Sequence, residues 1–233
     1  MKDKAIKLTQ LVYSSVKKLV INNQLLTFFV LGNALNTVIL IMLTTGQMIS
    51  ISPVLADLAF SLIIASFIFF MKPKNEFRYL FIWTLVLTTL YIGNVTYYKF
   101  FQSFLSVSML SVASQLGEVG DSVTGLITID QVVYIWFPIA LYLYNRRLIK
   151  KNKKKVEKKK EVRLNYFKTS VALSAVLLIL FSFNLSGSDW TRLYRQWNRE
   201  YLVMKFGLSI YHINDVFRSV FYCIHFIFFI IIS

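Results

Sequence analysis

Five apolar blocks along the chain limit its fold more than any other feature. Each contains 17 to 21 residues, close to the roughly 20 that a helix needs to cross about 30 Å of hydrocarbon. A backbone in lipid must satisfy its own polar groups, so such blocks form helices. The sequence therefore predicts an all-α, polytopic membrane protein with five transmembrane helices. The expected spans cover residues 25–45, 53–71, 79–98, about 125–144 and 169–185.

The overall composition agrees with a membrane protein. Hydrophobic residues make up 56% of the 233 residues, and charged residues only 16%, against roughly 25% in an ordinary soluble domain. A soluble fold of this length could not cover so much apolar surface. The net charge of +15 does not indicate nucleic-acid binding, because the basic residues flank apolar blocks instead of forming a patch on a folded domain.

A lysine-rich loop, residues 145–168, separates the fourth and fifth blocks. Its central stretch, residues 146–163, holds 11 basic residues and two glutamates. Lys and Arg beside a span resist translocation and are attracted to the anionic inner leaflet, so this loop is predicted to be cytosolic. Alternating spans then place 20 of the 26 basic residues on the cytosolic side and six on the other. The N-terminus is therefore predicted to be cytosolic, and residues 187–216 extracellular.

This orientation divides the chain into four expected parts. Residues 1–24 form a cytosolic amphipathic lead-in, 25–186 the five-helix domain, 187–216 an external amphipathic linker and 217–233 an apolar tail. The tail's apolar run is short for a span. Three interpretations of this tail remain open. It is a thin sixth helix, an interfacial segment, or a sequence that was not part of the original protein. The long connection after the third span is expected to begin as an interfacial helix on the outer leaflet.

The external linker carries aromatic and basic residues at helical spacing. On one continuous helix, Arg192, Arg195 and Arg199 would form a stripe beside a second face of aromatic and apolar residues. Guanidinium groups bind phosphate oxygens in pairs, so the stripe is a candidate lipid or phosphate site. The alternative is simple anchoring to anionic headgroups. Either way, the expected partners are membrane lipids. The residues on the second face are Trp190, Leu193, Tyr194, Trp197, Tyr201 and Met204.

Several polar residues fall inside the expected spans, where an unpaired polar group is costly. Asn33 and Asn36 lie three residues apart in the first span and so share a helix face. Interhelical hydrogen bonding is the favoured interpretation, and a substrate path is the alternative. Asp57, Asn94 and Asp130 fall near the outer ends of the next three spans. They are expected either to frame a shared polar pocket or to cap helix ends at the interface.

The sequence supplies no catalytic constellation. Its single cysteine, Cys223, allows no internal disulfide, and its two histidines, His212 and His225, have no metal-ligand spacing. No phosphate-binding glycine loop, nucleophile elbow or paired carboxylate set is present in the sequence. We therefore assign no catalytic residue, no metal ligand and no cofactor.

The stretch YIGNVTYYKFF, residues 91–101, resembles the membrane domain of the lipoteichoic acid synthase family. Asn94, Tyr97 and Tyr98 fit a motif at the end of that family's third span, as do Lys99, Phe100 and Phe101, and Gly117, Gly120 and Asp121 fit the stretch that follows. The resemblance implies a multi-pass protein of a bacterial plasma membrane. Family members continue into an external domain of the sulfatase type, which holds manganese and a threonine nucleophile. It transfers glycerol phosphate from phosphatidylglycerol to a cell-envelope polymer.

No counterpart of that catalytic domain occurs in this sequence, so manganese is expected only in the missing domain. The preferred hypothesis is a membrane anchor, truncated near Val216 and inactive alone. Two alternatives remain. One is a small lipid or solute transporter that uses Asn33, Asn36 and Asp57. The other is a membrane partner that regulates a full-length synthase. The expected protein partner is such a synthase or another copy of this chain.

Overall fold

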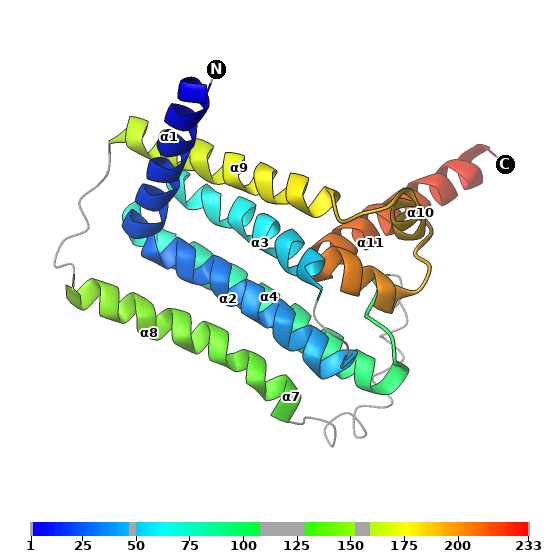
Figure 1. Cartoon of the computed structure of the whole chain (residues 1–233). Coiled ribbons are helices and arrows are strands. Elements are labelled where there is room, and N and C mark those ends of the chain that lie inside the picture. The colour runs from blue at the N-terminus through cyan, green and yellow to red at the C-terminus, as the bar shows by residue number, and fades with distance from the viewer. Residues whose placement is uncertain (1, 47–49, 108–128, 152–158, 233) are drawn as a thin grey trace.

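The computed structural model of the chain describes residues 2–46, 50–107, 129–151 and 159–232 (Figure 1). Within these ranges the regular structure is helical. The elements in chain order are α1 (Lys2–Asn22), α2 (Gln24–Thr44), α3 (Ile51–Ser66), η1 (Phe67–Phe70), α4 (Pro73–Phe101), α7 (Ile129–Val132), η3 (Val133–Ile135), α8 (Trp136–Lys151), α9 (Lys160–Ser182), α10 (Gly187–Arg195) and α11 (Arg199–Ile232).

Four segments are long and apolar enough to cross a membrane: α2, α3 with η1, α4 and α9. They match four of the five expected spans. The remaining one, 125–144, begins outside the described residues and continues as α7, η3 and the first half of α8. A fifth span is therefore not established, although α8 lies along α2 and α4 (Figure 1). Phe137 of α8 packs so closely on α2 that a Cβ added at Gly32 would come within 2.3 Å of its ring.

Local sequence signals explain where the spans begin and end. Pro73 occupies the first turn of α4, where its missing N–H removes no helical hydrogen bond. Ser50 caps α3, because its hydroxyl accepts a hydrogen bond from the Ser52 amide at 3.3 Å. At its other end α4 runs through Phe101 and stops at Gln102, which has φ +48°. The third span is thus a few residues longer than the sequence predicted.

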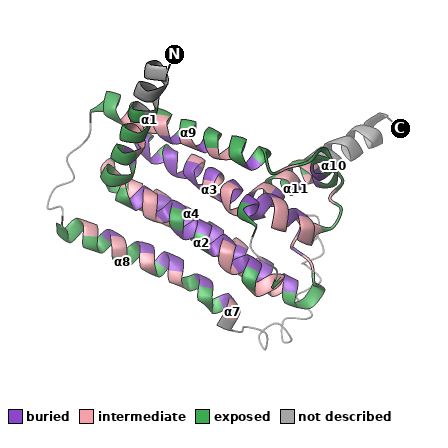
Figure 2. Cartoon of the chain, viewed as in Figure 1, coloured by how far each residue is buried: buried purple, intermediate pink, exposed green. Residues whose placement is uncertain are grey.

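Helix α3 lies at the centre of the bundle and contacts α2, α9 and α11. Ala56, Ala59 and Ala65 on α3 are fully buried, and such small side chains let neighbouring helices approach closely. The Ser174 hydroxyl of α9 donates to the Ala59 carbonyl at 2.9 Å. Helix α9 otherwise shows long exposed stretches (Figure 2), as a helix on the lipid-facing edge of the bundle would.

The helices that carry the basic connections meet at one end of the bundle. Figure 1 shows α1, the end of α8 and the start of α9 there, while α7, α10 and α11 lie at the opposite end. We call these the basic end and the acidic end, since the aspartates described below lie at the second. Helix α1 lies within residues 1–24, for which the sequence predicts a cytosolic lead-in. The described connections between the long helices therefore lie alternately at the two ends.

The prediction of one continuous external helix is wrong. Residues 187–232 form two helices, because Gln196 and Asn198 adopt left-handed conformations with φ of +52° and +53°. The Asn198 side-chain oxygen accepts a hydrogen bond from the Tyr201 amide at 3.1 Å and so starts α11. Asparagine tolerates this backbone region better than most residues. The linker also does not stay on the surface, since Leu202, Phe206 and Tyr211 of α11 are fully buried.

Candidate functional site: the seat of the last helix

Helix α11 is kinked at Gly207, where φ is +79° and ψ is +163°. This region of backbone space is essentially restricted to glycine. The kink interrupts the helical hydrogen-bond ladder, so the amides that follow need partners outside their own helix. A carboxylate from another helix provides them.

That carboxylate belongs to Asp57 of α3, which is completely buried. Its two oxygens accept hydrogen bonds from the backbone amides of Leu208 at 3.3 Å and Ser209 at 3.0 Å. The Thr37 hydroxyl of α2 donates a third at 2.7 Å. Asp57 thus acts as a helix cap supplied in trans, and its acceptor oxygens face the positive end of the helix that begins there.

The fit between α3 and α11 depends on the absence of a side chain at Gly207. A Cβ at that position would lie 2.9 Å from the Pro53 carbonyl oxygen and 3.1 Å from the Asp57 carboxyl carbon. Both contacts are closer than carbon normally allows. Glycine is therefore required here twice, for its backbone conformation and for the close approach of the two helices.

Two further helices join the same network. The hydroxyls of Thr37 and Tyr91 lie 3.0 Å apart, and Tyr91 of α4 donates to the Asn33 side-chain oxygen at 3.2 Å. The Tyr91 ring stacks on Tyr134 of η3, with the ring centroids 5.4 Å apart. We define the α11 seat by the six residues whose polar groups make these hydrogen bonds. They are Asn33, Thr37, Asp57, Tyr91, Leu208 and Ser209.

One turn further along α11, His212 meets Asn94 of α4. The Asn94 side-chain oxygen accepts from the Leu105 amide at 3.2 Å, and its nitrogen donates to the Leu90 carbonyl at 2.8 Å. The second N–H of that nitrogen points to His212 Nε2 at 2.8 Å, so Nε2 is the acceptor. Burial lowers the pKa of His212 to about 4, only partly opposed by the nearby charge of Asp215. The imidazole is therefore neutral at physiological pH, as its acceptor role demands.

Asp215 ties α11 to two more segments. Its carboxylate accepts from the Ser106 hydroxyl at 2.9 Å, from the Val107 amide, and from the Gln196 side chain at 2.9 Å. Ser106 and Val107 follow α4, and Gln196 forms the corner between α10 and α11. The segment after α4 and the α10–α11 corner are thus both held to the same turn of α11.

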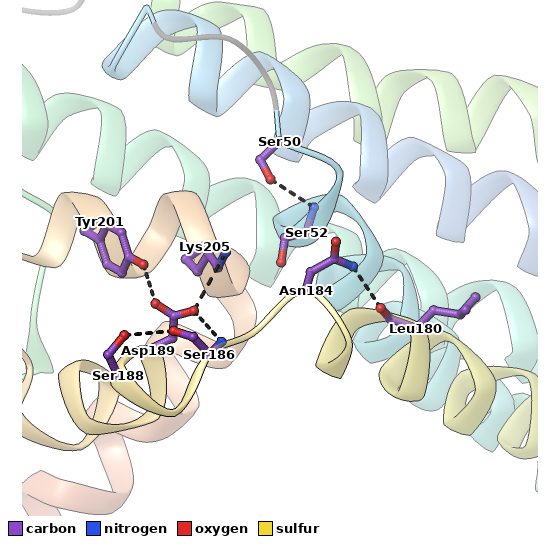
Figure 3. Close-up of polar contacts among 9 residues, drawn as sticks. All are labelled: Ser50, Ser52, Leu180, Asn184, Ser186, Ser188, Asp189, Tyr201 and Lys205. Atoms are coloured by element: carbon purple, nitrogen blue, oxygen red, sulfur yellow. Dashed lines mark hydrogen bonds and ion pairs between the residues drawn. The ribbon is translucent and has the colours of Figure 1, made fainter.

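Asp189 fixes α10 against the start of α11 (Figure 3). Asp189 completes a capping box with Ser186, in which its carboxylate accepts a hydrogen bond from the Ser186 amide at 2.8 Å. The same carboxylate accepts a hydrogen bond from the Tyr201 hydroxyl and lies 3.8 Å from the Lys205 ammonium. Burial opposes ionisation of this carboxyl, but the hydrogen bonds from Ser186 and Tyr201 outweigh it and hold the pKa of Asp189 below its ordinary value. The Arg192 guanidinium lies 4.6 Å from the centre of the Tyr201 ring.

The structure distributes the sequence-predicted polar residues among separate contacts. Asn36 accepts from the Trp136 indole at 2.9 Å and links α2 to α8, so the favoured interhelical bonding is found here. Asp57 and Asn94 both hold α11. Asp130 does not join them, because it forms a half-exposed ion pair with Lys99. A pocket shared by all three residues is therefore not formed.

The expected arginine stripe is split by the corner between the two helices. Arg192 and Arg195 are exposed on α10, whereas Arg199 is the first residue of α11. Sequence reasoning also missed Gly207, His212 and Asp215, which help to hold α11 against the bundle. The one available signal was a glycine in the middle of an otherwise apolar helical run, which often marks a close backbone approach.

These features define a polytopic helical membrane domain whose last helix is locked into its bundle by buried carboxylates. The chain matches the family of the lipoteichoic acid synthase N-terminal domain over residues 8–221 and belongs to that family. It is also 31% identical, over 166 residues, to the lipoteichoic acid synthase of Staphylococcus saprophyticus. That alignment covers 69% of this chain and 24% of the relative, so the chain spans about a quarter of the relative's length. No solved structure shows a significant match.

Proposed function

We propose that this chain is a membrane domain that holds a phosphoglycerol transferase at the outer surface of a bacterial plasma membrane. The α11 seat carries the proposal. In the predicted orientation α11 lies at the outer ends of the spans, and four other elements hold it in a fixed position there. A catalytic domain bound to or continuous with α11 would be kept near its lipid substrate at high effective concentration.

The chemistry is proposed to reside outside the described residues. Within those ranges no group of three or more His, Cys, Asp or Glu side chains is placed to hold a metal ion. The relative's name assigns synthase activity to a protein about four times as long as the matched region. We therefore expect no release of diacylglycerol when the purified chain is incubated with manganese and phosphatidylglycerol. Turnover by the chain alone would contradict this assignment.

Rigid seating of α11 can be measured directly. Spin labels placed at Ile82 on α4 and Ile213 on α11, in a Cys223→Ser background, occupy partly exposed positions. Pulsed electron–electron distance measurements in detergent should give one narrow distribution. Gly207→Ala should broaden it. A broad distribution in the unmodified chain would remove the basis for a positioning role.

The orientation is the second part of the proposal. Cysteines placed one at a time at Ser188 and Lys155, again without Cys223, should label from opposite sides of the membrane. A membrane-impermeant maleimide added to intact cells should modify the Ser188 position and spare the Lys155 position. Labelling of the Lys155 position from outside would reverse the topology.

We further propose that α10 rests on the outer membrane surface. Trp190, Tyr194 and Trp197 are more than half exposed and lie beside the exposed Arg192 and Arg195. Aromatic rings with polar edges suit the headgroup level, and guanidinium groups bind lipid phosphates. The transporter alternative has less support, because the oxygens of Asn33, Asn36 and Asp57 are all engaged in interhelical hydrogen bonds.

A further inference from the structure

An apolar groove of about 310 Å³ lies between α3, α4 and α11. Its volume is within the range of sites that bind small molecules. The groove passes beneath the part of α11 that follows the Gly207 kink. Its apolar walls include Phe60 of α3, Trp83, Leu87 and Leu90 of α4, and Ile213 and Val216 of α11.

The polar residues along the groove are already engaged with other parts of the protein. Tyr91 bonds to Thr37 and Asn33, and His212 bonds to Asn94. The Ser209 amide and hydroxyl both serve the Asp57 carboxylate. An occupant would therefore meet hydrocarbon walls and would gain little from carrying hydrogen-bonding groups of its own.

The groove opens onto the surface that faces the bilayer. Ile82 and Val86 of α4, which neighbour its lining residues, are 59% and 43% exposed within a candidate span. On the other rim, Val216 and Phe217 of α11 are 46% and 72% exposed. Lipid chains in the surrounding membrane can thus reach the groove from its α4 side.

The groove follows α4 from Trp83 to Leu90, a length of about 10 Å at 1.5 Å per residue. Its lining is almost wholly apolar, and its α4 wall belongs to a candidate span. The medium around such a span is the hydrocarbon of the bilayer. An acyl chain is therefore the occupant that the surroundings supply.

We propose that this groove binds one acyl chain of a membrane phospholipid, lying lengthwise between α3 and α4 under α11. The bound chain would fill the space beside the α11 seat and help to hold the last helix in place. This inference does not depend on the transferase role, because it follows from the groove and its bilayer exposure alone.

The test uses a phospholipid with a photoreactive diazirine near the middle of one acyl chain, added to the purified full chain in lipid nanodiscs. Crosslinked peptides should come from residues 83–90 and 213–217 several-fold more often than from the exposed apolar face of α9. Excess unlabelled phospholipid should suppress the groove signal saturably. Equal labelling of all bilayer-facing helices would overturn the proposal, and so would a crosslinked dimer that occupies these residues.

Variants then test the site itself. Leu90→Trp and Ile213→Trp should each lower groove labelling several-fold, because the indole fills the volume. Val176→Trp, on the 50% exposed lipid-facing side of α9, is the matched control and should leave it unchanged. Phosphatidylglycerol and phosphatidylcholine probes should label alike, since the polar groups of the groove are engaged. Labelling by only one of the two phospholipids would contradict an acyl-chain site. If a variant misfolds, saturable competition in the unmodified chain still tests the proposal.

Discussion

The two ends of the molecule are held together in different ways. At the basic end the polar links between described segments are few and partly exposed. The Arg163 guanidinium donates to the Met71 carbonyl, and Asn22 donates to the Tyr166 hydroxyl. At the acidic end lie Asp57, Asp130, Asp189 and Asp215, and each joins its own element to another segment.

The difference shows that the two charge types have separate tasks. Lysines in a connector set which side of the membrane it occupies, and they do so while fully hydrated. A carboxylate accepts several hydrogen bonds at once, so a buried one can fix backbone amides from two or three segments. In the proposed orientation, topology would be encoded at one end and the position of the last helix at the other. Substitutions at matched positions can test this division.

The largest effect is expected from Gly207→Ala. The new Cβ would meet the Pro53 carbonyl and Asp57, and an L-residue would have to adopt a backbone region that costs about 1–3 kcal/mol by itself. We expect a loss of about 3 kcal/mol in the free energy of unfolding, measured by thermal unfolding in detergent. Gly187→Ala is the control, because nothing lies within 4 Å of a Cβ at that position. Equal melting temperatures for the two variants would show that the kink is not structurally required.

Asp57→Ala should have the next largest effect. It leaves two buried backbone amides without their acceptor, at about 1–3 kcal/mol for each group left unpaired after relaxation. The Thr37 hydroxyl keeps the Asn33 carbonyl as an acceptor at 3.2 Å. We expect a total loss of about 2–3 kcal/mol and faster proteolysis of α11. Asp130→Ala removes the half-exposed ion pair with Lys99 and should cost about 0–1 kcal/mol. If Asp130→Ala proved the more damaging of the two, the acidic end would not depend on its buried seat.

The sequence predicted the helical spans well and the seat poorly, for a physical reason. Span positions follow from local hydropathy and from basic residues at the ends, and both are visible in a single segment. The seat depends on a glycine at position 207 meeting an aspartate at position 57. Neither residue has a distinctive neighbourhood, and only the packing of α11 on α3 brings them together.

The external helix shows the same limit at shorter range. A helical-wheel pattern fits residues 190–204 equally well whether or not the chain turns at Gln196 and Asn198. Asn198 followed three residues later by Tyr201 is a weak helix-start signal. The periodicity of residues 190–204 outweighed this signal. A periodic pattern cannot show a break between two helices when the apolar positions of the second continue the spacing of the first.

The neutral His212 predicts a third, pH-dependent effect. Its pKa is about 4 in the folded protein against 6.5 in the unfolded chain, so between these values the unfolded state binds more protons. The contribution of His212 to the free energy of unfolding should be fully present above pH 6.5 and should decrease as the pH falls toward 4. The loss is expected to be about 1–3 kcal/mol, since a pKa that differs by one between the folded and unfolded states corresponds to about 1.4 kcal/mol. Melting temperatures measured from pH 7.5 to 4.5 should record it.

His212→Gln isolates this contribution. Glutamine offers an oxygen to Asn94 and cannot titrate, so the variant should lose most of the slope in that pH window. Asp189 does not interfere there. Its lowered pKa gives stability that is present above pH 3.8 and lost only as the pH falls further. An unchanged slope in the variant would assign the acid sensitivity to another group.

The smallest effects come from two tyrosines, one associated with each end. Tyr91→Phe removes the buried hydroxyl that bonds to Thr37 and Asn33, and we expect it to cost about 1 kcal/mol. Tyr166→Phe removes a hydroxyl that accepts from the exposed Asn22 side chain, and it keeps the ring contact with Phe69. Its change should stay within about 0.5 kcal/mol, as for most surface substitutions. The same atom is deleted in both variants, so their losses in the free energy of unfolding can be compared directly by thermal unfolding. Equal losses would mean that the two ends are held equally tightly.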